Sequence, residues 1–150
     1  MSSSATNTST PPMKQLIEVM RNLDAQQYQK ILHTLKAEHP SLAEAILEAM
    51  FTFDDLIYIT DRSMQTLLKE IDRSALTRAL KQSNEDVKQK ILNNLSRRAA
   101  ENLLEEIDLL PPVRLSEVKE AQRNISKLAR SMEDAGKIVV VRPEDDDPLV

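Results

Sequence analysis

Apolar residues recur every three or four positions along most of this chain, which is the spacing of amphipathic helices. The pattern starts near Met13 and continues, with brief interruptions, to Met132. Side chains suited to helix N-caps stand at several interruptions, among them Asp24, Asn84 and Ser96. The sequence therefore predicts an all-α fold of short helices with brief turns, stacked as a superhelix more than as a four-helix bundle.

Both ends of the chain lack this pattern. Residues 1–12 are Ser, Thr, Asn and Pro in low-complexity order, so they predict a disordered tail. Residues 142–150 are rich in Pro and Asp and predict an acidic disordered tail. Before that tail, the longest helix should stop at Gly136, and residues 138–141 should run extended along the edge of the helices.

Residues 96–107 predict a helix with two different faces. The apolar side is formed by Ala99, Ala100, Leu103, Leu104, Ile107 and Leu110. Arg98 and Glu105 lie almost opposite this side and, being seven residues apart, stand in line roughly 10 Å from each other along the axis. Glu101 lies between them and Glu106 at the flank. Such a row is either a solvated face that keeps the protein soluble or a surface for a partner.

The amino-acid composition excludes several classes of function. Charged residues make up 29% and hydrophobic ones 41%, as in a soluble globular protein. The net charge of −4 arises mostly in residues 142–150, and no helix is purely basic, so we expect no nucleic-acid partner. The absence of cysteine excludes disulfides and thiolate chemistry. No apolar run is long enough for a signal or a membrane span, which predicts no direct membrane insertion and fits a cytoplasmic location.

No residue constellation of an enzyme is present in the sequence. His33 and His39 are six positions apart across a helix end, unlike metal ligands on one helix face. The single glycine, Gly136, excludes a glycine-rich phosphate loop. Glu105 and Glu106 are adjacent and point about 100° apart on a helix, so they cannot converge on one bond. We expect no catalytic residues, no metal and no cofactor.

Several short motifs in the C-terminal two thirds carry a family resemblance. They are Met-Phe-Thr-Phe at 50–53, Asp-Asp-Leu at 54–56, Asp-Arg-Ser-Met-Gln at 61–65, Ala-Leu-Lys at 79–81, Asn-Leu-Ser-Arg-Arg-Ala-Ala at 94–100 and Pro-Val-Arg-Leu-Ser at 112–116. In this order and spacing they resemble the C-terminal domain of the flagellar motor switch family FliG. The similarity runs from about Met13 to Val141, so the chain resembles a shortened or stand-alone form without the N-terminal and most of the middle domain.

The resemblance implies both an architecture and a charged site. Residues 13–53 would form an armadillo-like helical part, and residues 54–141 a helical subdomain that faces the membrane-bound stator. The stator-binding charges would be Lys81, Arg98, Glu105, Glu106 and Arg114. Exposed ion pairs are worth only about 0–1 kcal/mol each. Such weak pairs suit a contact that must form and release at every step.

The resemblance also implies a hinge at Met50, Phe51 and Phe53, about which the stator-facing half would reorient when the motor reverses. Met and Phe at a helix junction fit an ordinary core equally well. Gln82 and Pro111 stand where family members commonly have glycine, which makes the backbone less permissive at these two points.

The implied function is that of a rotor and switch component of the bacterial flagellar motor. Its partners would be a stator cytoplasmic loop of the MotA type and switch proteins of the FliM type. A second copy of this chain, or a separate FliG chain, is a further candidate partner. The implied location is the basal body, on the cytoplasmic face of the inner membrane. The alternative is a non-motor helical adaptor or regulatory module that keeps the fold but does not enter the rotor.

Overall fold

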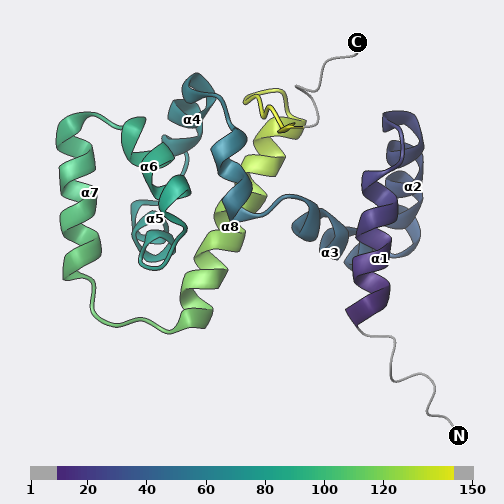
Figure 1. Cartoon of the computed structure of the whole chain (residues 1–150), viewed down its shortest axis with the longest axis horizontal. Coiled ribbons are helices and arrows are strands. Elements are labelled where there is room, and N and C mark those ends of the chain that lie inside the picture. The colour runs from purple at the N-terminus through teal and green to yellow at the C-terminus, as the bar shows by residue number, and fades with distance from the viewer. Residues whose placement is uncertain (1–9, 144–150) are drawn as a thin grey trace, which may run out of the picture. The chain divides into compact units, whose positions relative to one another are not determined.

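The computed structural model describes residues 10–143 (Figure 1). The regular elements within these residues are helices, so the predicted all-α fold is confirmed. The chain divides into two compact units, Met1–Met50 and Phe51–Val150. The expected boundary lay after Phe53, and the observed one therefore falls slightly earlier.

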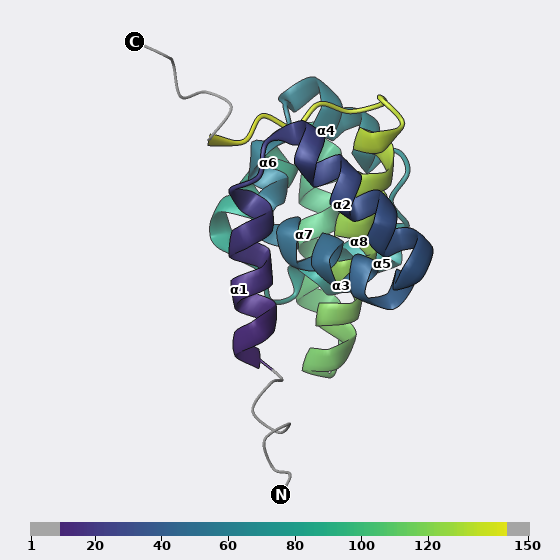
Figure 2. The same cartoon turned by 90° about the vertical axis from the view of Figure 1, so that its right-hand side faces the viewer.

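Among the residues that the structure describes, the first unit contains three helices around a small core. Helices α1 (Thr10–Arg21), α2 (Ala25–Glu38) and α3 (Pro40–Met50) gather together, with α3 packed against both of the others (Figures 1 and 2). From Met13 onward, where burial is described, its buried hydrophobic side chains are Met20, Leu32, Ala43 and Ile46. Val19 and Ile31 remain 54% and 40% exposed, although their spacing is helical. Few side chains therefore hold this unit together.

The starts of the first two helices follow from local chemistry. The Asp24 carboxylate accepts from Gln27 N at 2.8 Å, and the Gln27 side chain accepts from Asp24 N at 3.3 Å. This reciprocal capping box confirms the predicted cap of α2. The predicted N-terminal tail needs correction, because α1 already begins at Thr10. Pro11 and Pro12 do not prevent this, since the first turn of a helix needs no backbone N–H from them.

The second unit is built from six helices within the described residues. They are η2 (Phe53–Tyr58, a 3₁₀ helix), α4 (Asp61–Leu68), α5 (Arg73–Leu80), α6 (Glu85–Asn93), α7 (Arg97–Leu109) and α8 (Leu115–Asp134). The long helix α8 packs along α5 and also touches η2, while α7 lies against α5 and α6 against η2. In Figure 1, α7 is at the outer edge of this unit.

A continuous hydrophobic core joins the elements of the second unit. The side chains with almost no exposure include Leu56, Ile59, Met64, Leu67, Ala79, Ile91, Leu103 and Ala129. Phe51 and Phe53, only 3% and 6% exposed, belong to the same core. Both phenylalanines of the proposed hinge are thus anchored in the second unit.

Helix α8 ends at the predicted glycine. Gly136 has a φ of 76°, and its N–H donates to Glu133 O at 2.9 Å, while Lys137 N donates to Met132 O at 2.8 Å. This pair of bonds is a Schellman motif, which serves the carbonyls that a helix end leaves without partners. The predicted stop is confirmed.

After α8 the chain returns to the start of the unit. Val140 forms an isolated antiparallel bridge with Ile59. The flanking hydrogen bonds run from Thr60 N to Val139 O at 3.2 Å and from Val141 N to Tyr58 O at 2.8 Å. The expectation of an extended segment packed on the helices is confirmed for residues 138–141, where Ile138 and Val140 are buried.

The predicted acidic tail needs correction at its first residue. Arg142 donates to both carboxylate oxygens of Glu133, at 3.0 and 3.1 Å, and lies 5.5 Å from the ring centroid of Phe51. Both contacts join residues distant in sequence, so local composition did not reveal them. The remaining tail predictions fall on residues 1–9 and 144–150, which lie outside the described residues.

Candidate functional site

Helix α7 is fixed by a cap at its start and by a buried apolar side. The Ser96 hydroxyl accepts from Ala99 N at 3.1 Å, which confirms the predicted N-cap. Leu103 and Ile107 are buried, at 0% and 6% exposure. These anchors determine which side chains of α7 face outward.

Arg98 and Glu105 face outward from α7 as the helical spacing requires. Both side chains are exposed, and neither has a hydrogen bond or ion pair with any residue between 10 and 143. Glu101, between them, lies 3.4 Å from Arg97, and both of these side chains are largely exposed. The two ends of the row therefore display unneutralised charges of opposite sign.

Glu106 is already engaged inside the protein. Its carboxylate accepts from Arg73 Nε at 2.9 Å and lies 3.4 Å from the hydroxyl of Thr77 on the same helix, α5. The side chains of Glu106 and Arg73 are each 47% exposed. The negative charge of Glu106 is thus balanced by α5.

Lys81 is also engaged. It is the C-cap residue of α5 and is half-buried. Its Nζ donates to the carbonyl oxygens of Ile107 and Leu110, at 3.2 Å in each case. The ammonium group of Lys81 therefore serves the C-terminal end of α7.

Arg114 occupies the N-cap position of α8. Its backbone N–H donates to Glu117 at 3.0 Å, while its exposed side chain has no polar partner in the described part of the chain. The five charges implied by the family pattern thus fall into two groups, three unpaired and two engaged. Sequence reasoning missed this division because the partners of Lys81 and Glu106 lie more than 25 positions away.

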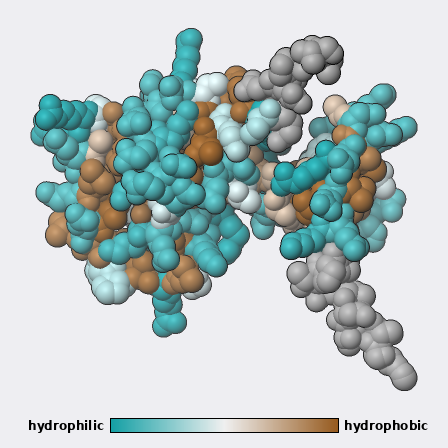
Figure 3. Space-filling model, in the orientation of Figure 1, coloured by the Kyte–Doolittle hydropathy of each residue, from teal (hydrophilic) through white to brown (hydrophobic). Residues whose placement is uncertain are grey.

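Exposed leucines accompany the charges. Leu104 and Leu109 on α7 are 38% and 74% exposed, and Leu115 at the start of α8 is 52% exposed. Figure 3 shows hydrophobic residues among hydrophilic ones on the side of α7. Leu104 was expected on the buried side, but it lies at the edge of that stripe and remains partly exposed. A shallow groove of ≈ 310 Å³ beside these leucines is lined by Ser74, Thr77, Glu106, Leu109, Leu110 and Pro111.

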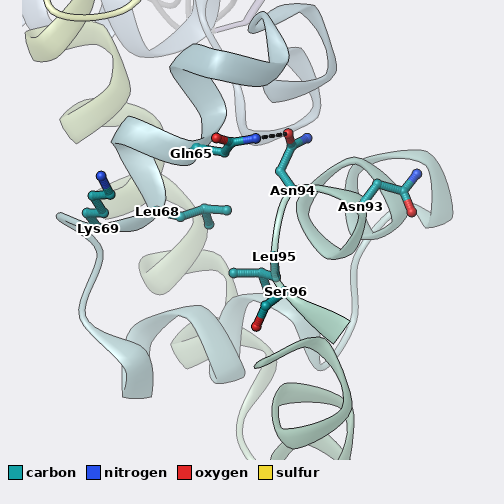
Figure 4. Close-up of a pocket in the computed structure, with 7 residues that line it drawn as sticks. All are labelled: Gln65, Leu68, Lys69, Asn93, Asn94, Leu95 and Ser96. Atoms are coloured by element: carbon teal, nitrogen blue, oxygen red, sulfur yellow. Dashed lines mark hydrogen bonds between the residues drawn. The ribbon is translucent and has the colours of Figure 1, made fainter. Parts of the chain in front are cut away.

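A second hollow, of ≈ 470 Å³, lies beside the turn that leads into α7 (Figure 4). Gln65 Nε2 donates across it to Asn94 Oδ1 at 3.4 Å, and Leu68 and Leu95 point into the space between them. Of its lining residues only Lys69 is charged. This hollow contains none of the five charges.

One carboxyl group of the second unit has a shifted pKa. The hydrogen bond from Asn94, at 3.1 Å, and then the hydrogen bond and charge of Lys90, at 3.0 Å, hold the pKa of Asp61 below its ordinary value. These contacts join α4 to α6. They lie on elements other than α7, so they support the unit and leave the charged row unaffected.

Residues 10–143 contain no group of three or more His, Asp or Glu side chains placed to hold a metal ion. None of the helices in the described region is long and apolar enough to cross a membrane.

The fold and the site define a helical module that displays a charged helix at its surface. Residues 33–140 match the model of the FliG C-terminal domain. The chain therefore belongs to the FliG C-terminal family, and the resemblance inferred from the motifs is confirmed.

Relatives agree over most of the chain. It is 43% identical to the flagellar motor switch protein FliG of Thermotoga maritima, covering 83% of this chain and 37% of the relative. It is 38% identical to that of Borreliella burgdorferi, covering 99% and 43%. The solved structure of full-length FliG from Aquifex aeolicus superposes with a TM-score of 0.79 at 38% identity, covering 85% and 40%.

The chain spans about two fifths of the length of the curated relatives it matches. These relatives are flagellar motor switch proteins, so the family is one of motor components and not of enzymes. The structural match also supports the predicted armadillo-like part and helical subdomain.

Proposed function

We propose that this chain is a rotor and switch component of the bacterial flagellar motor, in which the exposed face of α7 contacts the stator. The observation that carries the proposal is the pair Arg98 and Glu105, exposed and unpaired within the described residues on a helix anchored by a buried side. Membership in the motor switch family supports the assignment. The chain would act in the cytoplasm, at the basal body.

The contact is electrostatic and reversible. Arg98 and Glu105 are separated by seven residues, or roughly 10 Å along the axis, so a stator loop of the MotA type that offers the opposite signs in the same order can meet both. Each exposed pair contributes about 0–1 kcal/mol. Such a contact is strong enough to transmit a step when several pairs act together, and weak enough to release.

We assign this contact to Arg98, Glu105 and Arg114. Their side chains have no polar partner among residues 10–143, so they are available to another protein. Lys81 and Glu106, the other two charges of the family pattern, already have partners on α7 and α5. The free charges therefore carry the stator contact in this proposal.

The test is a double charge reversal, Arg98→Glu with Glu105→Arg, in a strain whose own copy of the gene is deleted. It preserves net charge but inverts the order of signs along α7, so we expect loss of swarming and of rotation in tethered cells. The matched control is Glu120→Lys with Lys127→Glu, because these exposed residues of α8 are also seven apart. The control should swarm normally.

Normal swarming by the α7 double reversal, with the protein folded and present at wild-type level, would defeat the stator contact. A fluorescent fusion tests the other class of function. If the fusion never gathers at basal bodies and deletion leaves rotation unchanged, the chain is a helical adaptor outside the rotor.

For switching, we propose that the junction at Met50, Phe51 and Phe53 is the hinge. The two compact units divide between Met50 and Phe51, and both phenylalanines are anchored in the core of the second unit. A few residues between two packed bodies can absorb the backbone change of a two-state motion. A switch partner of the FliM type that binds one state better would shift the population towards that state.

A further inference from the structure

We infer that α5 clamps α7 at two points, through Arg73 with Glu106 and through Lys81 with the last carbonyls of α7, so that Lys81 and Glu106 position the charged row and do not themselves contact the stator. The functional half of this inference rests on the proposed stator contact. The clamp itself is a statement about packing within the second unit and can be tested without a motor.

The first point of the clamp is an ion pair between the start of α5 and the last turns of α7. Arg73 is the first residue of α5, and its Nε donates to Glu106 at 2.9 Å. Thr77, one turn further along α5 and 6% exposed, places its hydroxyl 3.4 Å from the same carboxylate oxygen. The Thr77 hydroxyl also donates to Arg73 O at the shorter distance of 2.9 Å, so the ion pair with Arg73 is the main contact of Glu106. This charge-assisted bond favours one rotation of α7 about its axis.

The second point is a cap supplied from another helix. The last carbonyls of a helix have no partner within it, and they usually bond to the N–H groups that follow. Here the two residues after the C-cap Leu110 are Pro111 and Pro112, which have no N–H. The Leu110 N–H donates to the Ile107 carbonyl at 3.3 Å, and Lys81 Nζ donates to that carbonyl and to the carbonyl of Leu110, at 3.2 Å in each case. Its positive charge also suits the negative end of the helix dipole.

At the end of α8, the other long helix of this unit, backbone N–H groups serve the last carbonyls in the usual way. Gly136 and Lys137 donate their own N–H groups to the carbonyls of Glu133 and Met132. Helix α7 cannot use this arrangement because prolines follow it. Lys81 at the end of α5 therefore gives the Leu110 carbonyl a donor that Pro111 and Pro112 cannot supply.

Helix α5, which supplies both clamp residues Arg73 and Lys81, is in turn held in place by α8. Gln122 of α8 donates from Nε2 to the carbonyl oxygens of Ala79 and Gln82, at 2.9 and 3.0 Å. These carbonyls flank Lys81 in sequence. Side-chain donors thus link α8 to the end of α5, and the end of α5 to the end of α7.

The clamp explains why the five family charges differ in environment. Arg98 and Glu105 stand free on α7, while Lys81 and Glu106 are occupied in setting the position and rotation of that helix. A rotation of α7 about its axis would change the directions in which Arg98 and Glu105 point. Loss of a clamp residue should therefore impair the motor although the residue touches no partner.

The first experiment is amide hydrogen exchange on the purified full chain with Lys81→Met. Removing a charged hydrogen-bond donor from two helix-end carbonyls should speed exchange in the last turn of α7 about tenfold. Lys69→Met is the matched control, because Lys69 is the C-cap residue of α4 and is exposed. Lys81→Arg should restore much of the protection. Unchanged exchange at Leu109 and Leu110 in folded Lys81→Met would overturn the clamp.

The second experiment separates positioning from contact. Arg73→Glu and Glu106→Arg should each reduce swarming, because each leaves two like charges face to face. The double variant restores an ion pair with its signs exchanged, so the clamp predicts recovery of swarming. A direct stator contact by Glu106 predicts instead that the double variant stays defective, and that result would overturn the positioning role. Failure of the stator proposal would appear separately, in normal swarming by the reversal of Arg98 and Glu105.

Discussion

The two compact units of this protein use similar helices but very different cores. In the first unit, described from residue 10, the buried hydrophobic side chains are Met20, Leu32, Ala43 and Ile46. In the second unit a continuous cluster takes side chains from η2, from the α-helices α4 to α8 and from the segment after α8. Apolar burial is the main favourable term in folding, so the second unit should be far more stable.

This difference suits the stator contact proposed for α7. A row of weak ion pairs transmits force only if the helix that carries it does not yield, and α7 is anchored in the larger core by Leu103 and Ile107. Regions with few buried contacts open at low free energy. We therefore expect the first unit to open at a lower free energy than the second, which supports α7.

The largest effect is expected from Phe53→Ala in the core of the second unit. Phe53 is 6% exposed, and removing a buried Phe side chain costs about 3–5 kcal/mol. Chemical denaturation should show a lower midpoint for the second unit. If the junction is also a hinge, cells that carry the variant should change their rotational bias. An unaltered bias with a folded protein would leave Phe53 a role in the core alone.

A slightly smaller loss in the free energy of unfolding is expected from Ile46→Ala in the first unit, but this loss should open the whole unit. Ile46 is fully buried, and the substitution costs about 2–5 kcal/mol. That is comparable with the whole stability of a small unit. Amide exchange should then show α1 to α3 open while the second unit keeps its protection.

The matched control for this experiment is Ile31→Ala, since Ile31 belongs to the same unit but is 40% exposed. It should leave the protection of α1 to α3 nearly unchanged. If Ile46→Ala lowered the exchange protection of both units equally, the two units would unfold together. The proposed difference in stability between them would then be wrong.

The smallest effect is expected from Asp61→Asn. The folded protein lowers the pKa of this carboxyl below its ordinary 3.8, so the charged form stabilises the second unit above that pH. The contribution is lost as the pH falls through the lowered pKa. Thermal melting should therefore show a small deficit for the variant at neutral pH that shrinks below pH 3.8. A deficit independent of pH would assign the effect to packing instead of charge.

Features set by neighbours in sequence could be predicted. The caps Asp24 and Ser96 and the stop at Gly136 depend on bonds that reach three to five residues, and the structure contains them. The outward position of Arg98 and Glu105 follows from helical geometry in the same way.

Features set by distant partners could not be predicted. Nothing near Lys81 or Glu106 in the sequence shows that each meets a residue at least 26 positions away. The tripeptide Asp-Arg-Ser occurs at 61–63 and again at 72–74, yet Asp72 caps α5 whereas Thr60, and not Asp61, caps α4. The same tripeptide therefore stands at different positions relative to the start of each helix, and only the structure shows this difference.

The return of residues 139–141 to the start of the second unit has a topological consequence. The backbone bonds to Tyr58 and Thr60, together with Arg142 beside Phe51, bring the first segment of the unit and its last described segment side by side. The backbone of the unit thus nearly closes on itself, and only a covalent link between these two segments is missing. A permuted gene that joins these ends and opens the loop at Pro111 and Pro112 would encode the same packed body.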